Sequence, residues 1–366
     1  MNRIAAEQDV RAEELSAIVL DQADRLFRGE VTKERLAQAD RGVWQDRIWT
    51  AIQHAALPLA LVAEVQGGAG LTGRDALRLI RRSGYHTLPV PLAETMIAAA
   101  LWAEASGAPP EGAVSLAPVV VEDGVGIERI GSGYVLSGRA RRVPWAGQVD
   151  HLLVFARDQG GGGWLALLSR PLPMTEQRRN IACEPRDTLV FDGSALPERA
   201  VRPAPSGCVG DGLISLGALI RAQQMVGAME RCLDYSLTYA MERKQFGRPI
   251  GKFQAVQLML AEAAGQYAAA AAAADLAAEA YGTEQFPFAV AIAKARVGEA
   301  AGKVAEVSHQ THGAMGFTQE HPLHFATRRL WSWRDEFGNE TFWQERIGQM
   351  VCSRGGELLW PTLVGA

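Results

Sequence analysis

Residues 216–243 read LGALIRAQQMVGAMERCLDYSLTYAMER, and their apolar side chains recur with the period of a helix that buries one face. The same period recurs further along the chain, which predicts long helices over 209–241, 251–282 and 284–312. Long helices in succession usually pack as a bundle. The C-terminal region is therefore predicted to be a four-helix-type bundle.

Two regions of different character precede this bundle. Residues 4–108 also show helical spacing, but Gly67-Gly68 and Pro89-Val90-Pro91 would divide them into short helices. From about 112 to 205, runs such as VSLAPVVV and HLLVFAR alternate with Gly and Pro clusters, a pattern typical of short antiparallel strands. We predict a mainly α-helical protein with a small central β-domain. The expected domains are an N-terminal helical domain over 1–111, a β-barrel-like middle domain over 112–205 and a C-terminal helical bundle over 206–366.

A run of four glycines, Gly160 to Gly163, stands before Trp164 in the predicted β-domain. A phosphate-binding glycine loop is normally followed by the start of a helix, and no helix start follows here. We therefore interpret this run as a hairpin loop.

The composition excludes several kinds of partner. Cys183, Cys208, Cys232 and Cys352 have neither CxxC nor metal-ligand spacing, which indicates reduced thiols and no metal site. The net charge is −4 with acids and bases mixed along the chain, so nothing resembles the basic stripe that a nucleic acid requires.

Membrane association is not expected either. The N-terminal residues alternate charged and apolar positions and contain no continuous apolar run. The alanine-rich stretch 267–280 is interrupted by Asp275 and Glu279, which would be costly in lipid. These features predict a cytoplasmic protein with neither a signal peptide nor a membrane span.

Two segments carry a resemblance to the acyl-CoA dehydrogenase family. Residues 242–265, ERKQFGRPIGKFQAVQLMLAEAAG, resemble the family's Arg-x-x-Phe-Gly turn after a long helix. Residues 310–323, QTHGAMGFTQEHPL, are similar to its Gln-x-x-Gly-Gly-x-Gly-Phe/Tyr-Thr-x-Glu motif. The stretches GGAGLTGRDAL and PVPLAETM resemble its N-terminal domain, and the middle third matches most weakly. The resemblance implies an oxidoreductase that uses FAD to introduce an α,β double bond into an acyl-CoA substrate.

In this family the two motifs hold the adenine and pyrophosphate half of an FAD that is bound mainly to the neighbouring subunit. An arginine and a glycine-rich turn can supply the cation and the backbone N–H groups that a pyrophosphate needs. Taken singly, Arg243 could be a solvated arginine at a helix end, Gln310 a surface amide and Phe246 a core aromatic. The cofactor contacts implied by the resemblance are Arg243, Gln245, Phe246, Gln310, Gly313, Ala314 and Gly316.

The catalytic base of the family has no counterpart at its known positions. The base must reach the α-proton of the thioester and be ionised near neutral pH. In the family it stands either before a glycine in the C-terminal part or early on the helix that leads into the Arg-x-x-Phe-Gly turn. Ungapped comparison puts Phe337 at the first position, and counting back from Arg243 puts Gly217 at the second. Neither side chain can accept a proton, so no catalytic residue is expected at either position.

Nearby carboxylates are weaker alternatives. Asp335, Glu336 and Glu340 lie close to Phe337 in sequence. Adjacent helical side chains diverge by roughly 100°, so Glu336 would face elsewhere unless the local backbone is irregular. The other interpretation is a solvated, acidic helix entry. Its neighbouring cations would be Arg328, Arg329 and Arg334.

The middle domain departs from the family as well. The family's Thr-Glu-Pro-x-x-Gly-Ser-Asp loop, which packs on the flavin ring, has no counterpart in SLAPVVVEDGVGIERI, residues 115–130. The family's Trp-Ile-Thr-Asn segment aligns with Arg142–Trp145, so Pro144 replaces a threonine expected near flavin N5. Proline has neither hydroxyl nor N–H. We therefore expect a damaged isoalloxazine site beside an intact adenine-side site.

Three hypotheses are compatible with this asymmetry. The first is a subunit of a hetero-oligomer of the α2β2 kind that completes the FAD site of a homologous partner. The PLAETM and HPLHFATRRLW segments resemble the bacterial branch that acts on steroid side chains, which suggests a steroid-derived acyl-CoA. The second is a self-sufficient homo-oligomer that uses Glu336 or Glu340 as its base. The third is a non-catalytic scaffold of the same fold.

Overall fold

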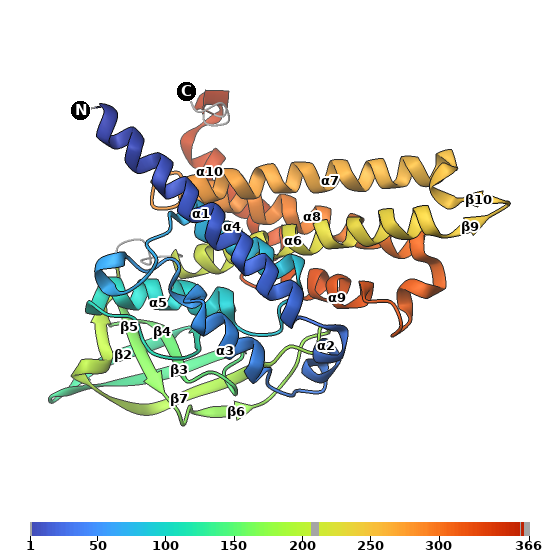
Figure 1. Ribbon diagram of the computed structural model, residues 1–366. Coiled ribbons are helices and arrows are strands. Elements are labelled where there is room, and N and C mark those ends of the chain that lie inside the picture. The colour runs from blue at the N-terminus through green and yellow to red at the C-terminus, as the bar shows by residue number, and fades with distance from the viewer. Residues whose placement is uncertain (1, 206–211, 359, 362–366) are drawn as a thin grey trace.

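The computed structural model describes residues 2–205, 212–358 and 360–361 of the chain (Figure 1). The N-terminal region contains five α-helices: α1 (Asn2–Glu30), α2 (Lys33–Asp40), α3 (Asp46–His54), α4 (Gly73–Tyr85) and α5 (Leu92–Ser106). Short 3₁₀ turns at Leu57–Leu59 and Glu64–Gln66 join α3 to α4. The Gly67-Gly68 pair follows the second turn, where the sequence predicted a break.

The middle region consists of strands. They are β1 (Val114–Ala117), β2 (Val125–Ile130), β3 (Gly133–Pro144), β4 (His151–Arg157), β5 (Gly163–Ser169), β6 (Met174–Glu176), β7 (Arg186–Pro197) and β8 (Val201–Pro203). They form one sheet in the order β6-β7-β3-β2-β4-β5-β8, and β1 pairs with β4 in parallel. The four-glycine run joins β4 to β5, which are antiparallel, so its interpretation as a hairpin loop is confirmed.

Strand β4 shows how the sheet is covered on both faces. Alternate side chains of a strand point to opposite faces. Leu152 and Val154 belong to an apolar core on one side of the sheet, whereas Leu153 and Phe155 belong to the core shared with the helices. A strand buried on both faces reads as a continuous apolar run, which explains the sequence HLLVFAR.

The C-terminal region contains the predicted long helices. They are α6 (Gly212–Glu242), α7 (Gln254–Glu279), α8 (Phe286–His312), α9 (Leu323–Arg334) and α10 (Glu340–Arg354). A two-stranded hairpin of β9 (Lys244–Gln245) and β10 (Arg248–Pro249) separates α6 from α7. In Figure 1 this hairpin projects from the end of the bundle that lies farthest from the sheet. The predicted start of the first helix, 209–211, lies outside the described residues.

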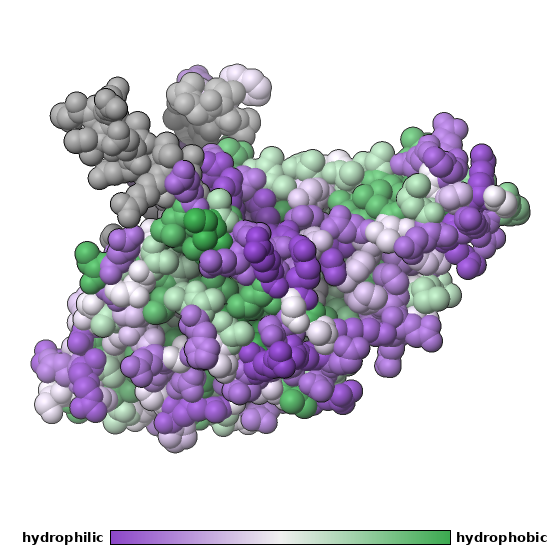
Figure 2. All heavy atoms as spheres, viewed as in Figure 1, coloured by the Kyte–Doolittle hydropathy of each residue, from purple (hydrophilic) through white to green (hydrophobic). Residues whose placement is uncertain are grey.

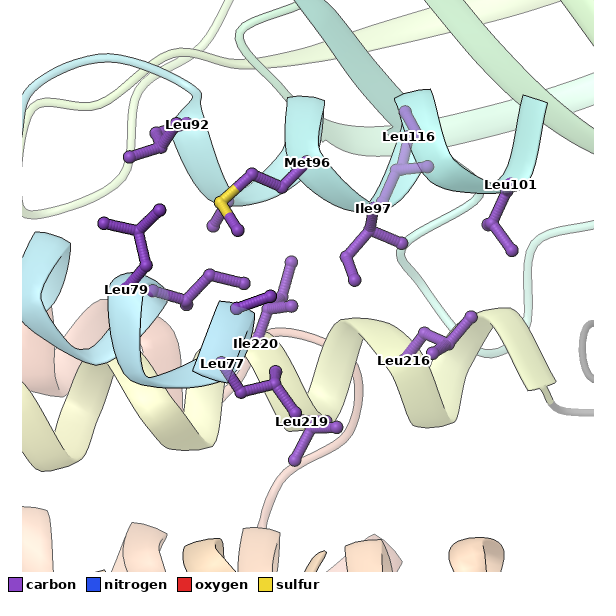
Figure 3. Close-up of a cluster of buried hydrophobic side chains, with 14 of the residues drawn as sticks. Leu77, Leu79, Leu92, Met96, Ile97, Leu101, Leu116, Leu216, Leu219 and Ile220 are labelled. Atoms are coloured by element: carbon purple, nitrogen blue, oxygen red, sulfur yellow. The ribbon is translucent and has the colours of Figure 1, made fainter. Parts of the chain in front are cut away.

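Helix α5 packs between the sheet and the bundle, against β1 on one side and α6 on the other (Figure 1). Figure 3 shows the apolar side chains of α4, α5, β1 and α6 converging on one core, including Leu79, Met96, Leu116 and Ile220. Helices α4 and α6 cross with their backbones in contact at Gly84. A Cβ added to this glycine would overlap the backbone of α6. The predicted fold class, mainly helical with a central sheet, is confirmed.

The described residues contain neither a membrane-spanning helix nor a cluster of metal ligands. Across residues 2–205, 212–358 and 360–361, no helix has the length and apolar character needed to span a membrane. Within the same ranges, no group of three or more His, Cys, Asp or Glu side chains could hold a metal ion.

Candidate functional site

The two family-like motifs lie together at the far end of the bundle. Helix α6 ends at Glu242, immediately before the hairpin, and α8 ends at His312, immediately before the glycine-rich turn. The ring of Tyr239, in the last turn of α6, stacks on His312 with 4.6 Å between ring centroids. Segments that are about 70 residues apart in sequence therefore meet at one surface.

The hairpin at 244–249 has a regular turn geometry. Phe246 and Gly247 both have positive φ angles, 50° and 81°, which is the backbone of a type I′ hairpin turn. The N–H of Ile250 donates to the Arg243 carbonyl over 2.8 Å and closes the hairpin. Arg243 and Gln245 are exposed, and Phe246 is 92% exposed. The interpretation of Phe246 as a core aromatic is thus wrong, because the turn carries its ring out into solvent.

The glycine-rich turn Gly313–Phe317 is a 3₁₀ helix. Gly313 has φ 58° and ψ −140°, a conformation that is accessible essentially to glycine alone, and it turns the chain out of α8. Gln310, Gly313 and Ala314 are exposed, whereas Gly316 is buried. A Cβ on Gly316 would lie 3.0 Å from the His312 Cβ. Gly316 therefore allows the turn to pack closely on α8, while the other three residues face outward.

The two expected base positions are in contact, although they are 120 residues apart in sequence. Gly217 lies on α6 and Phe337 in the turn between α9 and α10. A Cβ added to Gly217 would overlap the Phe337 ring. Phe337 is 1% exposed and belongs to the same apolar core as Trp145 and Leu216. An aromatic ring therefore occupies the space beside Gly217.

Buried groups fix the turn that carries Phe337. Its φ of 54° is unusual for a side chain of this size. The Lys294 ammonium donates to the Arg334 and Gly338 carbonyls, both over 2.7 Å, and the Trp343 indole donates to the Phe337 carbonyl over 3.0 Å. Burial lowers the pKa of Lys294 from 10.5 to about 8. The surrounding structure thus holds the strained backbone in place.

Glu336 is buried and paired with two arginines. Its two oxygens accept from Arg186 Nε and Arg221 Nε, each over 2.7 Å. Burial by itself would raise the pKa of Glu336, but the two guanidinium groups outweigh it and lower that pKa from 4.5 to about 2. The backbone of this turn is irregular, which Glu336 would need in order to reach the expected base position. Its carboxylate nevertheless points towards Arg186 and Arg221. The interpretation of Glu336 as part of a solvated helix entry is wrong, since its side chain is 7% exposed.

The ion cluster joins all three regions of the chain. Arg221 of α6 also pairs with Glu94 of α5 over 2.6 Å, and Arg186 of β7 pairs with Glu184 over 2.9 Å. Glu184 also forms an ion pair with Arg329 of α9 over 3.2 Å and accepts a hydrogen bond from Trp333 Nε1 over 3.0 Å. Sequence reasoning missed this cluster. A usable signal was the single charge in each of two apolar helical stretches, LAETMIAAA and LGALIRAQQ, because a charge buried there needs a partner.

Glu340, the second alternative base, is also paired. Its carboxylate accepts from Arg334 Nε over 2.7 Å, and its side chain packs against Gly298 of α8. It stands in the first turn of α10, where a negative charge is favourable. Asp335, between these residues, is exposed.

The Arg142–Trp145 segment contains a β-bulge. The register of β3 against β7 shifts between Ala140 and Val143, and Arg142 and Trp145 have φ angles of 56° and 58°. Pro144 and Trp145 are buried, and the Pro144 carbonyl accepts from Ser115 Oγ. The Pro144 carbonyl is therefore already hydrogen-bonded within the protein.

A cavity of about 270 Å³ lies beside these elements. It is bounded by the loop after β1, including Pro118 and Asp123, by Phe155 and Arg157 of β4, and by Leu213 at the start of α6. Asp123 accepts from Arg141 Nε over 2.7 Å. The cavity is small and partly apolar, and Leu213 is one turn before Gly217.

Comparison with known proteins agrees with this architecture. Residues 212–340 match the model of the acyl-CoA dehydrogenase C-terminal domain. Acyl-CoA dehydrogenase IpdE2 of Mycobacterium tuberculosis is 28% identical over 292 residues, which cover 80% of this chain and 82% of that protein.

Solved structures with the same fold include two complexes. A chain of the ChsE4-ChsE5 complex from Mycobacterium tuberculosis superposes with a TM-score of 0.84 at 22% identity, covering 93% of this chain and 97% of that one. A variant of the Tcur3481-Tcur3483 steroid ACAD gives a TM-score of 0.83 at 24% identity, with 93% and 99% covered. Residues 212–340 are therefore an acyl-CoA dehydrogenase C-terminal domain, and the chain as a whole shares the fold of these two complexes.

Proposed function

We propose that the chain is the non-basic subunit of a hetero-oligomeric, FAD-dependent acyl-CoA dehydrogenase. It holds the adenine and pyrophosphate half of the FAD that a homologous partner binds, and the partner supplies the catalytic carboxylate. The observation that carries this proposal is the contact between Phe337 and Gly217. That contact fills the space where the base of the family would stand.

The neighbouring carboxylates support the same conclusion. A general base must be free to accept a proton near neutral pH. Glu336 is committed to two arginines and has a pKa of about 2, so it is a poor proton acceptor at pH 7. Glu340 is committed to Arg334. Neither geometry favours a self-sufficient enzyme.

The residues at the bundle end fit one half of FAD. When bound, FAD supplies the acceptor for the hydride, and its pyrophosphate carries the negative charge. Arg243 is exposed beside a hairpin that also contains Lys244 and Arg248, so the surface is cationic. Figure 2 shows hydrophilic residues concentrated around this end of the bundle. The outward-facing Gln245, Gln310, Gly313 and Ala314 provide amides and accessible backbone for the same ligand.

The residues near the middle domain do not fit the ring half of FAD as well. Pro144 stands at the position of the expected hydroxyl, and its carbonyl is already bonded to Ser115. Trp145 and Phe337 fill the adjoining core. The chain therefore contributes to a flavin site at its bundle end, where a partner can approach.

The proposed substrate class is a bulky acyl-CoA, with a steroid-derived acyl group as the leading candidate. The support is the resemblance of the PLAETM and HPLHFATRRLW segments to the steroid branch and the fold shared with a steroid ACAD. The fold shared with the ChsE4-ChsE5 complex supports a hetero-oligomeric assembly.

The test is co-expression with a homologous subunit that retains the glutamate before glycine. We expect a yellow complex that oxidises acyl-CoA, and little flavin on this chain purified alone. In the complex, Arg243→Ala should lower FAD affinity about tenfold or more, because a charge-assisted contact to pyrophosphate is lost. Arg129→Ala, an exposed arginine in the β-domain, is the matched control. Full activity of the isolated chain would refute the proposal.

A further inference from the structure

A second cavity, of about 870 Å³, lies where α1, the start of α4 and the end of α7 meet. Helix α1 packs on α4 (Figure 1), and Arg74 of α4 pairs with Glu279 of α7 over 3.7 Å, which joins two of the walls. The cavity contains no residue of the two cofactor motifs and neither of the expected base positions. Its purpose is therefore not explained by the flavin site.

One wall of this cavity carries a buried hydroxyl group. Ser16 of α1 is 4% exposed, and its Oγ has no hydrogen-bond partner among the described residues. A hydroxyl group that is buried without a hydrogen bond destabilises the fold. Because Ser16 lines the cavity, a ligand placed there can supply the missing hydrogen bond.

The start of α4 faces the same cavity. Thr72 caps this helix, because its Oγ1 accepts from the Asp75 N–H over 3.2 Å and donates to the Asp75 carboxylate over 2.8 Å. The first N–H groups of an α-helix, here those of Gly73 and Arg74, have no partner within the helix. Both residues line the cavity. The partial positive charge of a helix N-terminus favours an anion at this position.

Two arginines of α4 stand beside this helix start, and their present partners hold them weakly. Arg74 lies 3.7 Å from Glu279, and Arg78 lies 3.4 Å from Asp75. Both arginine side chains are about half exposed, and ion pairs of this kind contribute little free energy. Each guanidinium can therefore turn to an anion in the cavity. Since two carboxylates balance the two arginines, the helix start and the Ser16 hydroxyl decide the preference for an anion.

The remaining walls of the cavity are mainly apolar. Ala17 and Leu20 of α1 and Ala278 of α7 line them, together with Tyr281. The Tyr281 ring packs directly on Gly73, where a Cβ would lie 2.6 Å from the ring. Apolar walls with a few convergent polar groups are typical of a site for a small molecule.

We infer that this cavity binds a small organic carboxylate with a bulky apolar body. The carboxylate accepts from Ser16 Oγ and from the N–H groups at the start of α4, with Arg74 and Arg78 beside it. The apolar body lies against Ala17 and Leu20. This site goes beyond the proposed function, because it requires neither FAD nor a partner subunit.

Isothermal titration of the full chain with adamantane-1-carboxylate tests the inference. We expect saturable binding at one site. Acetate and inorganic phosphate should bind about tenfold more weakly or worse, because they lack the apolar body. 1-Adamantanol has the body without the charge and should also bind about tenfold more weakly or worse. If 1-adamantanol or phosphate binds as tightly as the carboxylate, or if the carboxylate does not bind, the inference is wrong.

Substitutions in the walls locate the bound carboxylate. Ser16→Ala should weaken binding about tenfold, because a hydrogen bond to a charged group is lost. Arg74→Gln should weaken it as well, and Arg129→Gln, an exposed arginine of the β-domain, is the matched control. Ala17→Trp should abolish binding, since the indole fills the cavity from an exposed position that does not contribute to the core. Unchanged affinity in Arg74→Gln and Ala17→Trp would place the ligand elsewhere and overturn the inference.

Discussion

The bundle end and the predicted base position around Phe337 and Gly217 differ in how exposed and how paired their polar groups are. At the bundle end, Arg243, Gln245 and Gln310 point into solvent, and a phenylalanine ring lies open beside them. At the base position, Phe337 is packed into the core and every nearby acidic group but Asp335 is paired with an arginine. A surface with exposed cations and amides can bind a ligand, whereas a closed and charge-balanced core stabilises the fold. Substitutions at the predicted base position should therefore lower stability, whereas substitutions at the bundle end should mainly weaken binding.

Removing one member of the ion cluster should lower the free energy of unfolding more than any other change. Arg221→Met leaves Glu94 and Glu336 buried without their shared cation, and breaking a buried pair in this way typically costs about 3–5 kcal/mol. Urea unfolding should show that loss in the free energy of unfolding. The exposed Arg25→Met should change it by less than about 0.5 kcal/mol. A loss below about 1 kcal/mol for Arg221→Met would mean that the cluster is solvated.

The dependence of stability on acid pH should show whether the Glu336 carboxylate is ionised in the folded protein. Its folded pKa of about 2 is below the unfolded value of 4.5, so the carboxylate stabilises the fold above pH 4.5 and loses that effect as pH falls towards 2. By linkage, the shift corresponds to roughly 3 kcal/mol. Stability measured between pH 6 and 3 should fall steeply in the natural protein and less steeply in Glu336→Gln. Equal slopes would show that the two arginines do not lower the pKa of Glu336 in the folded protein.

Gly217→Ala should show how tightly the base position is closed. The added Cβ would overlap the Phe337 ring, and overpacking of this kind costs about 1–3 kcal/mol. Gly265→Ala in α7 is the matched control, since open space surrounds that glycine and alanine is the better helix former. Phe337→Ala in the same chain should relieve the overlap, so the two substitutions should be non-additive. Additive effects of the two substitutions on stability would mean that the Phe337 ring does not lie against Gly217.

Phe246→Ala should barely change stability. The side chain is 92% exposed, so the free energy of unfolding should change by less than about 0.5 kcal/mol. Association with the co-expressed subunit should nevertheless weaken, as measured by size-exclusion chromatography at decreasing concentration. Leu276→Ala, exposed near the other end of α7, should leave association intact. If both variants weaken subunit association equally, the hairpin tip has no specific role in that association.

Much of the fold could be read from periodicity. The segments predicted as helices over 251–282 and 284–312 are α7 and α8, each shorter by a few residues at one or both ends. Helix ends are set by local caps and turns, which a three- to four-residue period does not contain. The absence of a carboxylate at positions 217 and 337 was also visible, because it needs only the identity of two residues.

The surroundings of those residues were not visible. Glu336 was expected to face solvent because its sequence neighbours are charged, and Phe246 was considered as a core residue because it is aromatic. The structure reverses both environments. Glu336 meets Arg186 and Arg221, which are 150 and 115 residues away along the chain. No local pattern encodes contacts over such separations.

The sequence by itself determined which groups this protein has: helices with a buried face, a cationic turn, and no acid at two positions. Only the tertiary structure decided where those groups stand. It brought Phe337 against Gly217, closed the ion cluster around Glu336, and left Arg243 and Phe317 open at the bundle end. The physical reason is that periodicity and residue type are local properties, whereas burial and charge pairing depend on which distant segments pack together.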